Sequence, residues 1–310
     1  MSRSFEERWA ATLDSDQWRR ITGSAAGRAV RRSSAFRGAD TARRFVVTRL
    51  GAVADRDLFG DVHTLCITIG HVKSGGSLLG AMLDAHPNAA FADDLDALRY
   101  VRAGFEAEQV FRILVKGARR EVLKGRVTAR RLEPYSLFVP GGWQGSHRTL
   151  EVVGFSRAGP TTRGLSEEPD VLAGLRRTLG SLRPAFVHVV RHPADPVAAM
   201  VLRSGRSLDS AVRDYAEQCD RLLALRSRLP AEDLLTVRYE RFVRAPREGL
   251  VEACGFLGLA VEADHLDACG AVIRDDMTSE RDRIEWTSRA TDSTRRLIDR
   301  VDFLEPYRDG

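Results

Sequence analysis

The sequence predicts an α/β fold, a parallel central sheet flanked by helices, and two observations support this. From about residue 61 onward, short apolar runs that are partly β-branched alternate with longer helical segments. Such alternation is typical of a parallel sheet that is covered by helices on both faces. The composition fits this class, because 310 residues with 43% hydrophobic and 29% charged content can bury a full core.

The expected elements follow in order along the chain. The strands are the runs TLCITI, LEVVGF, AFVHVVR and LLTVRY, at residues 64–69, 150–155, 185–191 and 234–239. The main helices, in which apolar residues recur at helical spacing, are expected at 78–86, 169–180, 208–229 and 245–259. Sheets of this kind bind ligands beyond the C-terminal ends of their strands, so the loops after strands are where chemistry is expected.

The first 60 residues are expected to form a basic helical extension to a single domain at 61–310. They hold 12 arginines, no lysine and 7 acidic residues, which accounts for the whole net charge of +5. Phe5, Trp9 and Leu13 recur every four residues, which predicts an amphipathic helix docked on the body with solvated arginines outside. No nucleic-acid-binding motif accompanies the charge, so nucleic acid is not an expected partner, while peripheral membrane contact stays open.

Other features of the sequence narrow the class of protein. No apolar run has the length of a signal peptide or a membrane-spanning helix, so a cytoplasmic protein is expected. The four cysteines, Cys66, Cys219, Cys254 and Cys269, are far apart and form no CxxC pair. They are therefore expected to be buried thiols, and neither a disulfide framework nor a metal site is predicted.

The loop after the first expected strand has the composition of an anion-binding loop. In GHVKSGGS, residues 70–77, three glycines let the backbone turn tightly and approach a ligand. The helix that begins at Ser77 and Leu78 offers free N–H groups and the positive end of its dipole. The sequence therefore predicts a phosphate cradle at this point.

The position of the lysine distinguishes this loop from the Walker A pattern, GxxxxGK[ST]. Both glycines and the final serine are present, but Gly76 occupies the lysine position and Lys73 lies inside the loop. This disfavours a nucleotide kinase or other P-loop phosphotransferase. Lysine occurs only at 73, 116 and 124, whereas arginine is abundant, so we expect Lys73 to be functional rather than a random surface base.

A second loop with possible chemistry lies in VHVVRHPADPVAAMVLRSG, residues 187–205. Arg191 ends a strand, the chain turns through His192 and Pro193, and a helix follows. We expect Arg191 at the C-terminal edge of the sheet near the first loop, where it can clamp a second phosphate bidentately. A salt bridge to Asp195 is the structural alternative, and these residues alone leave the two open.

Taken together, the two loops and their spacing resemble those of the sulfotransferases that use 3′-phosphoadenosine 5′-phosphosulfate (PAPS), in particular a bacterial branch. The similarity runs from about residue 62 to 307 and includes KSG, LDAHPN, VVRHP, YERFV with FLGL, and the terminal RIEWTSRATDSTRRLIDRVDFLEPY. The resemblance implies a P-loop-like sulfotransferase fold. It also implies transfer of a sulfuryl group from PAPS to a hydroxyl or amine, with adenosine 3′,5′-bisphosphate (PAP) as the product.

The resemblance also implies roles for individual residues. The cofactor would be bound by Lys73, Ser74, Gly75, Gly76, Ser77, Leu78, Arg191 and Arg281, with the 5′-phosphosulfate on the first loop and the 3′-phosphate on the second. Lys73 would stabilise the leaving phosphate, and no metal is required. Asp94, where related enzymes usually have Glu, is the expected base, and Asp93 is either its substitute or a helix N-cap. His71, His86 and His147 are weaker candidates for the base.

Several positions depart from the pattern of the resembled family. The family's GDKKG reads GFSRAG here, which leaves Arg157 in place of two lysines. Ala199 stands where a Ser or Thr would bind the 3′-phosphate, and Glu280 stands where the family has a serine. These departures raise an alternative from a different class, a non-catalytic binding subunit, although the retention of Lys73 and Arg191 argues against it.

The segment at 95–150 is expected to be a helical insertion over the sheet edge that lines the acceptor site. It contains the aromatic residues Tyr100, Phe105, Phe111, Tyr135, Phe138 and Trp143. Aromatic and basic surroundings suit a moderately large acceptor such as a lipid, a glycan or an aromatic small molecule. Packing of the insertion itself explains the same residues equally well.

Overall fold

The computed structural model describes residues 34–54, 58–127, 135–273 and 279–308. The chain divides into two units, residues 1–54 and 55–310. In the first unit the described part is helix α4 (Ser34–Ala54), in which Arg44 pairs with Asp40 one turn earlier at 3.0 Å. The helix expected around Phe5, Trp9 and Leu13 lies outside the described residues.

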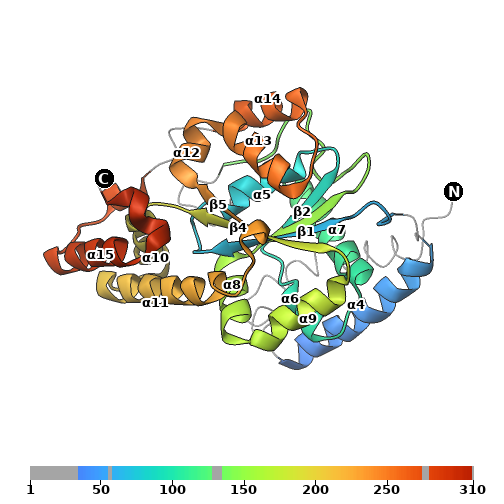
Figure 1. Ribbon diagram of the computed structural model, residues 1–310, viewed down its shortest axis with the longest axis horizontal. Helices are drawn as coiled ribbons and strands as arrows, with labels where there is room; N and C mark the ends of the chain where they lie inside the picture. Colours follow the sequence, from blue (N-terminus) through green and yellow to red (C-terminus); the bar gives the residue numbers. More distant parts are fainter. Residues whose placement is uncertain (1–33, 55–57, 128–134, 274–278, 309–310) are drawn as a thin grey trace, which may run out of the picture. The chain divides into compact units, whose positions relative to one another are not determined.

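The second unit is built on a five-stranded parallel sheet, which confirms the predicted fold class (Figure 1). The strands lie in the order β2-β3-β1-β4-β5, and each neighbouring pair is parallel. Their bounds are Thr64–Gly70 for β1, Ala89–Asp93 for β2, Val152–Ser156 for β3, Arg183–Val190 for β4 and Leu234–Arg238 for β5. Strand β2 was not predicted, because AAFAD is short and rich in alanine, which has low strand propensity.

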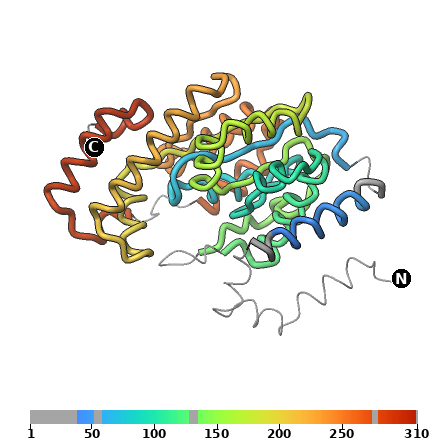
Figure 2. Tube along the Cα trace, turned by 90° about the horizontal axis from the view of Figure 1, so that it is seen from below, coloured from blue at the N-terminus to red at the C-terminus, as the bar shows by residue number. Residues whose placement is uncertain are grey.

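Helices cover both faces of the sheet, as predicted. Their bounds are Gly76–Asp84 (α5), Leu98–Arg102 (α6), Ala107–Leu123 (α7), Ala158–Glu167 (α8), Pro169–Leu179 (α9), Ala194–Ser204 (α10), Leu208–Arg226 (α11), Tyr239–Arg244 (α12), Pro246–Leu257 (α13), Ala263–Val272 (α14) and Ser288–Arg300 (α15). Short 3-10 turns lie at Ala231–Asp233 (η1), Glu280–Arg283 (η2) and Asp302–Tyr307 (η3). In Figure 1, α13 and α14 lie with α5 on one side of the sheet and α8, α9 and α11 on the other. Figure 2 shows the C-terminal helix α15, in red, beside α11.

The core of this unit is apolar on both sides of the sheet. On the α5 side, Leu79, Met82, Phe91, Leu250 and Leu257 belong to one buried cluster that joins α5 and α13 to the strands. The four cysteines are all buried and free, as predicted. None of the described helices is long and apolar enough to cross a membrane.

The strand order fixes where loops from opposite faces meet. Strands β1 and β4 are neighbours, but the chain leaves β1 for helix α5 on one face and leaves β4 for helices α10 and α11, of which α11 packs with α8 on the other face. Such a divergence opens a crevice at the C-terminal ends of the two strands. The loops that carry Lys73 and Arg191 both begin at this crevice.

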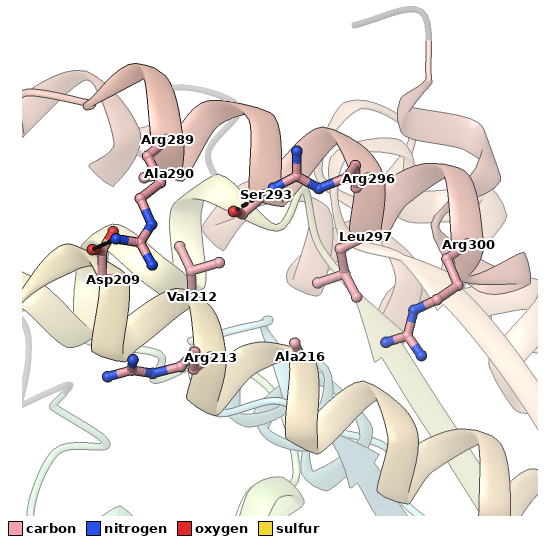
Figure 3. A pocket seen from close by; sticks show the side chains of 10 residues that line it. All are labelled: Asp209, Val212, Arg213, Ala216, Arg289, Ala290, Ser293, Arg296, Leu297 and Arg300. Atoms are coloured by element: carbon pink, nitrogen blue, oxygen red, sulfur yellow. Dashed lines mark hydrogen bonds and ion pairs between the residues drawn. The ribbon is translucent and has the colours of Figure 1, made fainter.

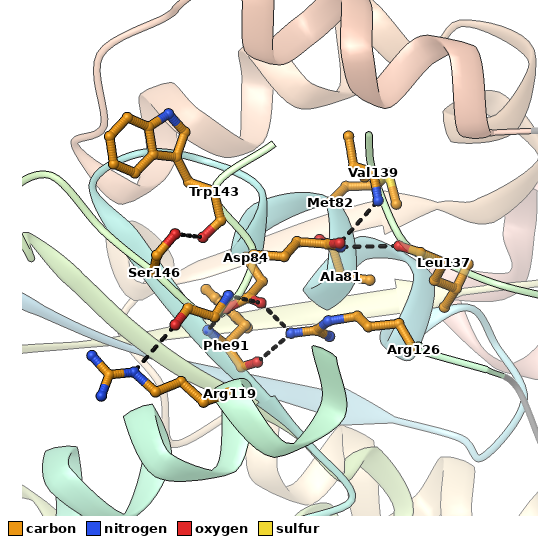
Figure 4. A network of polar contacts seen from close by, with 12 residues as sticks. Ala81, Met82, Asp84, Phe91, Arg119, Arg126, Leu137, Val139, Trp143 and Ser146 are labelled. Carbon is orange, nitrogen blue, oxygen red and sulfur yellow. Dashed lines mark hydrogen bonds and ion pairs between the residues drawn. The ribbon is translucent and has the colours of Figure 1, made fainter. Parts of the chain in front are cut away.

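The insertion at 95–150 is helical in its first part, where α7 packs against β2. Its second part lies at the other end of helix α5 from the first loop. There Gln144 Nε2 donates to the carbonyl of Ala81 at 2.8 Å, and the Gly145 N–H donates to Asp84 Oδ2 at 3.1 Å (Figure 4). Among the described residues of this segment, those that directly follow β2, about 94–107, lie at the edge of the sheet that carries the two loops.

Candidate active site

The first loop leaves strand β1 through backbone conformations that favour glycine. Gly70 has a φ of 124° and Gly75 a φ of 104°, both in the left-handed half of φ space. A Cβ atom at Gly75 would lie 2.3 Å from Cδ2 of Tyr239, so the loop backbone packs directly against this buried ring. The glycines therefore hold the loop close to the end of strand β5.

Lys73 sits in the same loop with a φ of 69°, a left-handed conformation that lysine rarely adopts. A residue held in such a conformation costs on the order of 1 kcal/mol relative to an unstrained backbone, and strain of this kind is concentrated at functional sites. A glycine at this position would adopt the same backbone conformation without strain. The backbone therefore does not explain why position 73 is a lysine, which indicates that its side chain has a function.

The start of helix α5 is open to a ligand. Gly75 is the N-cap and makes no side-chain cap hydrogen bond with the described residues. The N–H groups of Gly76, Ser77 and Leu78 belong to the first turn, where a helix has no carbonyl partners of its own. Beside them, Ser74 is 2% exposed and its Oγ has no hydrogen-bond partner among the described residues. These groups together form a set of donors for an anion.

Arg191 reaches this loop from the end of strand β4, as predicted. It is 4% exposed, its Nη1 donates to the carbonyl of Lys73 at 3.4 Å, and its guanidinium lies 4.6 Å from the ring centroid of Tyr239. The ends of β1, β4 and β5 thus meet at one point. This contact joins residues that are far apart in the sequence.

Arg191 also faces two buried carboxylates. Its Nε lies 3.4 Å from Asp195 Oδ2 and its Nη1 lies 3.6 Å from Glu280 Oε2. The pair with Asp195 is the structural alternative that the sequence left open, whereas Glu280 comes from the distant turn η2. Asp195 further accepts the backbone N–H of Arg281 at 3.1 Å, so Arg281 is held beside this cluster.

The ends of β2 and β3 bring two more acids to the same edge of the sheet. Asp93 Oδ1 accepts a hydrogen bond from Ser77 Oγ at 2.9 Å, which connects Asp93 to the first turn of α5. Burial raises the pKa of the Asp93 carboxyl, and the Ser77 hydrogen bond opposes this in part. Asp94 is half exposed, has a φ of 49° and lies 3.5 Å from Arg157 Nε. Sequence reasoning placed Asp94 first; the Ser77 contact depends on the pairing of β2 with β3, which the sequence did not predict.

The histidines near these loops have structural surroundings. His71 stacks on Tyr215 with ring centroids 3.8 Å apart, and burial lowers its pKa to about 4. His86 uses both ring nitrogens, with Nε2 2.8 Å from the carbonyl of Ala260 and Nδ1 accepting the N–H of Asn88. Neither is placed to accept a proton from a substrate at the loop.

One buried group in the described part of the chain has the composition of a metal site. Ligand atoms of His86, Cys254 and His265 lie within 4.8 Å of one another. Both nitrogens of His86 already hydrogen-bond to backbone groups, and burial raises the pKa of Cys254 to about 12. A metal would have to break one of these bonds and remove the thiol proton, so the group is explained as core packing.

A cavity of about 280 Å³ lies away from the loops, between helices α11 and α15 (Figure 3). It is lined by Asp209, Val212, Arg213, Ala216, Arg289, Ala290, Ser293, Arg296, Leu297 and Arg300. None of these residues follows a strand end, and two of the arginines pair with surface acids, Arg289 with Asp209 and Arg300 with Asp220. The chemistry of the loops therefore places the candidate active site at the crevice and not at this cavity.

Comparison with known proteins gives a family for part of this site. Residues 183–263, which run from β4 through Arg191 and Tyr239 to the start of α14, match a family model described as the sulfotransferase family. The predicted resemblance is confirmed over this segment. The match does not include the loop of Lys73, and no curated protein matches the chain.

Several solved sulfotransferase structures are similar to this chain. The sulfotransferase domain of the Synechococcus PCC 7002 olefin synthase has a TM-score of 0.48 and 16% identity, over 80% of this chain and 95% of that one. The sulfotransferase domain of the curacin biosynthetic pathway has a TM-score of 0.45 and 17% identity, over 77% and 97%. A mouse sulfotransferase complexed with PAP has a TM-score of 0.44 and 12% identity, over 81% and 93%.

Proposed function

We propose that the protein transfers a sulfuryl group from PAPS to a hydroxyl or amine of an acceptor. The observation that supports this most directly is the β1–α5 loop. There a lysine with a left-handed backbone, a buried serine hydroxyl and the start of a helix lie together, and no described residue hydrogen-bonds to the hydroxyl or caps the helix with a side chain. The family match over 183–263 adds the neighbouring strand ends, which carry Arg191 and Tyr239. The acceptor would be a small molecule, a glycan or a lipid.

The residues of the loop fit the 5′-phosphosulfate of such a donor. Ser74 supplies a hydroxyl, and the first-turn N–H groups of Gly76, Ser77 and Leu78 supply fixed donors. Lys73 supplies the positive charge. The donor, when bound, brings a sulfuryl group joined to a good leaving phosphate, and the residues of the chain have to orient it and stabilise the charge that develops.

In the proposed step, the acceptor oxygen or nitrogen forms a bond to sulfur while the bond between sulfur and the bridging phosphate oxygen breaks. The electron pair of that bond stays on the phosphate, where Lys73 and the loop N–H groups stabilise the added charge. The proton of the acceptor passes to a carboxylate. Positioning and charge stabilisation are the main contributions of the protein, as in phosphoryl transfer.

Asp94 and Asp93 are both proposed as this carboxylate. Asp94 is the base that the resemblance implies, and it follows the end of β2 at the same edge as the loop. Asp93 is tied to Ser77 of the loop helix, and its raised pKa makes it a stronger proton acceptor when ionised. The contact with Ser77 favours Asp93.

The binding experiment is calorimetric titration with PAP, with AMP and, separately, with ATP and magnesium. We expect micromolar binding of PAP that Lys73→Ala weakens at least about tenfold, since one charged donor to the phosphate is lost. Lys116→Ala, on a helix remote from the loop, is the matched control and should bind like the wild type. Absence of binding of both PAP and AMP would favour the non-catalytic alternative, and selective binding of ATP would favour a kinase.

The transfer experiment measures sulfation of a panel of phenol, sugar and amine acceptors with labelled donor. Lys73→Ala should lower turnover by about 100-fold or more, on the scale of one lost charge-stabilising donor. Asp93→Asn and Asp94→Asn separate the two carboxylates, because only the true base should lose transfer while donor affinity is kept. Full activity in both variants would exclude this pair as the base.

A further inference from the structure

Arg191 is already paired with carboxylates of the protein. Four buried or partly buried groups, called here the Arg191 cluster, lie together: Arg191, Asp195, Arg203 and Glu280. Glu280 bridges the two guanidinium groups, with Oε2 3.6 Å from Arg191 Nη1 and Oε1 3.4 Å from Arg203 Nη2. Within these four groups the two positive and two negative charges balance, and Arg281 lies beside them with its backbone N–H on Asp195.

This balance bears on what Arg191 can bind. A phosphate dianion that contacts Arg191 would come close to the Glu280 carboxylate, which is itself 7% exposed and therefore poorly screened by water. Like charges at short range in a buried setting oppose each other strongly, and this is a common means of rejecting a ligand. On helix α10, Ala199 is buried and has no hydroxyl to donate to a phosphate, and the Arg203 guanidinium of the same helix is already paired with Glu280.

Glu280 Oε2 is buried and ion-paired with Arg191 but has no hydrogen-bond donor among the described residues. A buried carboxylate oxygen without a donor is costly, so a ligand hydroxyl that donates to it would be favoured. Dinucleotide-binding folds use the same contrast, in which an acidic side chain takes a ribose hydroxyl and an arginine takes a ribose phosphate.

We propose that Glu280 makes this site select a nucleotide with a free ribose hydroxyl over one with a phosphate at the position that reaches Arg191. This inference rests on the proposed function, because it assumes that the β1–α5 loop holds a 5′-phosphosulfate. The sulfuryl transfer proposed above would then use adenosine 5′-phosphosulfate as its preferred donor in place of PAPS. In that case the acceptor atom forms its bond to sulfur, the bond from sulfur to the 5′-phosphate oxygen breaks, the proton goes to the carboxylate, and AMP leaves with the electron pair.

The test compares AMP with PAP by calorimetric titration, since the two differ only in the 3′-phosphate. In the wild type we expect AMP to bind at least as tightly as PAP. Glu280→Gln keeps the volume and removes the charge, so it should improve PAP binding by about tenfold or more without improving that of AMP. Glu280→Ser is a second variant with the same expected direction. Glu285→Gln, at an exposed position of the same segment, is the matched control and should change neither affinity.

The outcomes separate this inference from the proposed function. Binding of PAP ten times or more tighter than AMP in the wild type would overturn the role of Glu280 and leave the sulfuryl-transfer proposal intact. Equal effects of Glu280→Gln on both nucleotides would also overturn it. No binding of either nucleotide to the wild type would overturn the proposed function itself. If the Glu280 variants do not fold, the wild-type comparison still decides.

Discussion

Replacement of Gly75 by alanine tests whether the anion loop is held against Tyr239. Two costs are expected. An alanine at a φ of 104° is strained by about 1–2 kcal/mol. Its Cβ would also lie 2.3 Å from Tyr239 Cδ2. The ring cannot easily move away, because Tyr239 is 3% exposed and the Arg191 guanidinium lies 4.6 Å from the ring centroid. Overpacking of this kind costs about 1–3 kcal/mol, so Gly75→Ala should lower the free energy of unfolding by about 2–5 kcal/mol in total.

Urea denaturation in two backgrounds separates the two costs. In a Tyr239→Val background the steric overlap is removed, so Gly75→Ala should cost only the strain of about 1–2 kcal/mol. Gly255→Ala is the matched control, because its backbone is helical and a Cβ there meets nothing within 4 Å. That control should be neutral or stabilising by up to about 1 kcal/mol. An equal cost of Gly75→Ala in both backgrounds would refute the proposed packing of the loop on Tyr239.

Two further predictions concern the stability of the body. Asp84, buried at the end of α5, pairs with the buried Arg126 (Figure 4), so Asp84→Asn should lower the free energy of unfolding by about 3–5 kcal/mol. The control is Glu168→Gln, which breaks an exposed pair with Arg102 and should lower the free energy of unfolding by less than about 1 kcal/mol. Similar losses in the two variants would contradict an effect of burial on the strength of the pair. His71 has a pKa of about 4 in the folded state against about 6.5 in the unfolded state. Below pH 6.5 the unfolded state therefore binds a proton that the folded state does not, and the free energy of unfolding falls by up to about 3 kcal/mol as the pH falls toward 4. Between pH 7 and 4, the free energy of unfolding should therefore fall less steeply for His71→Gln than for the wild type. An equal pH dependence in the two proteins would show that another group is responsible for it.

The sequence predicted the local structure of the first loop. The strand, the tight turn with Lys73 and the helix start could be located because they lie within about a dozen consecutive residues, and each has a characteristic composition. The roles of these residues in binding stay predictions. Arg191 was expected beside this loop because parallel strands present their C-terminal ends at one edge. These inferences need only local pattern and the rule for parallel sheets.

The long-range part of the site could not be predicted in the same way. The approach of Glu280 to Arg191 depends on the packing of η2 against α10, and no local pattern in the sequence encodes that contact. The contact of Asp93 with Ser77 depends on β2, whose alanine-rich sequence does not read as a strand. The backbone N–H of Trp143 donates to the carbonyl of Ala85 at the C-terminal end of α5, and an aromatic residue in a sequence does not indicate at which end of a helix it lies. A role of the 95–150 segment in lining the acceptor site stays a prediction.

The central place of β1 in the sheet has a consequence for how this protein can change. On one side of β1 lie β4 and β5, whose C-terminal ends carry Arg191 and Tyr239, the residues proposed to contact the nucleotide. On the other side lie β3 and β2, whose C-terminal ends carry Arg157 and the two acids Asp93 and Asp94. If the proposed function is correct, substitutions at residues 95–107, which follow β2 and leave out the proposed bases Asp93 and Asp94, should change the preference for acceptors and leave the affinity for the nucleotide unchanged. Variation of the acceptor and binding of the donor would then depend on different halves of the same edge.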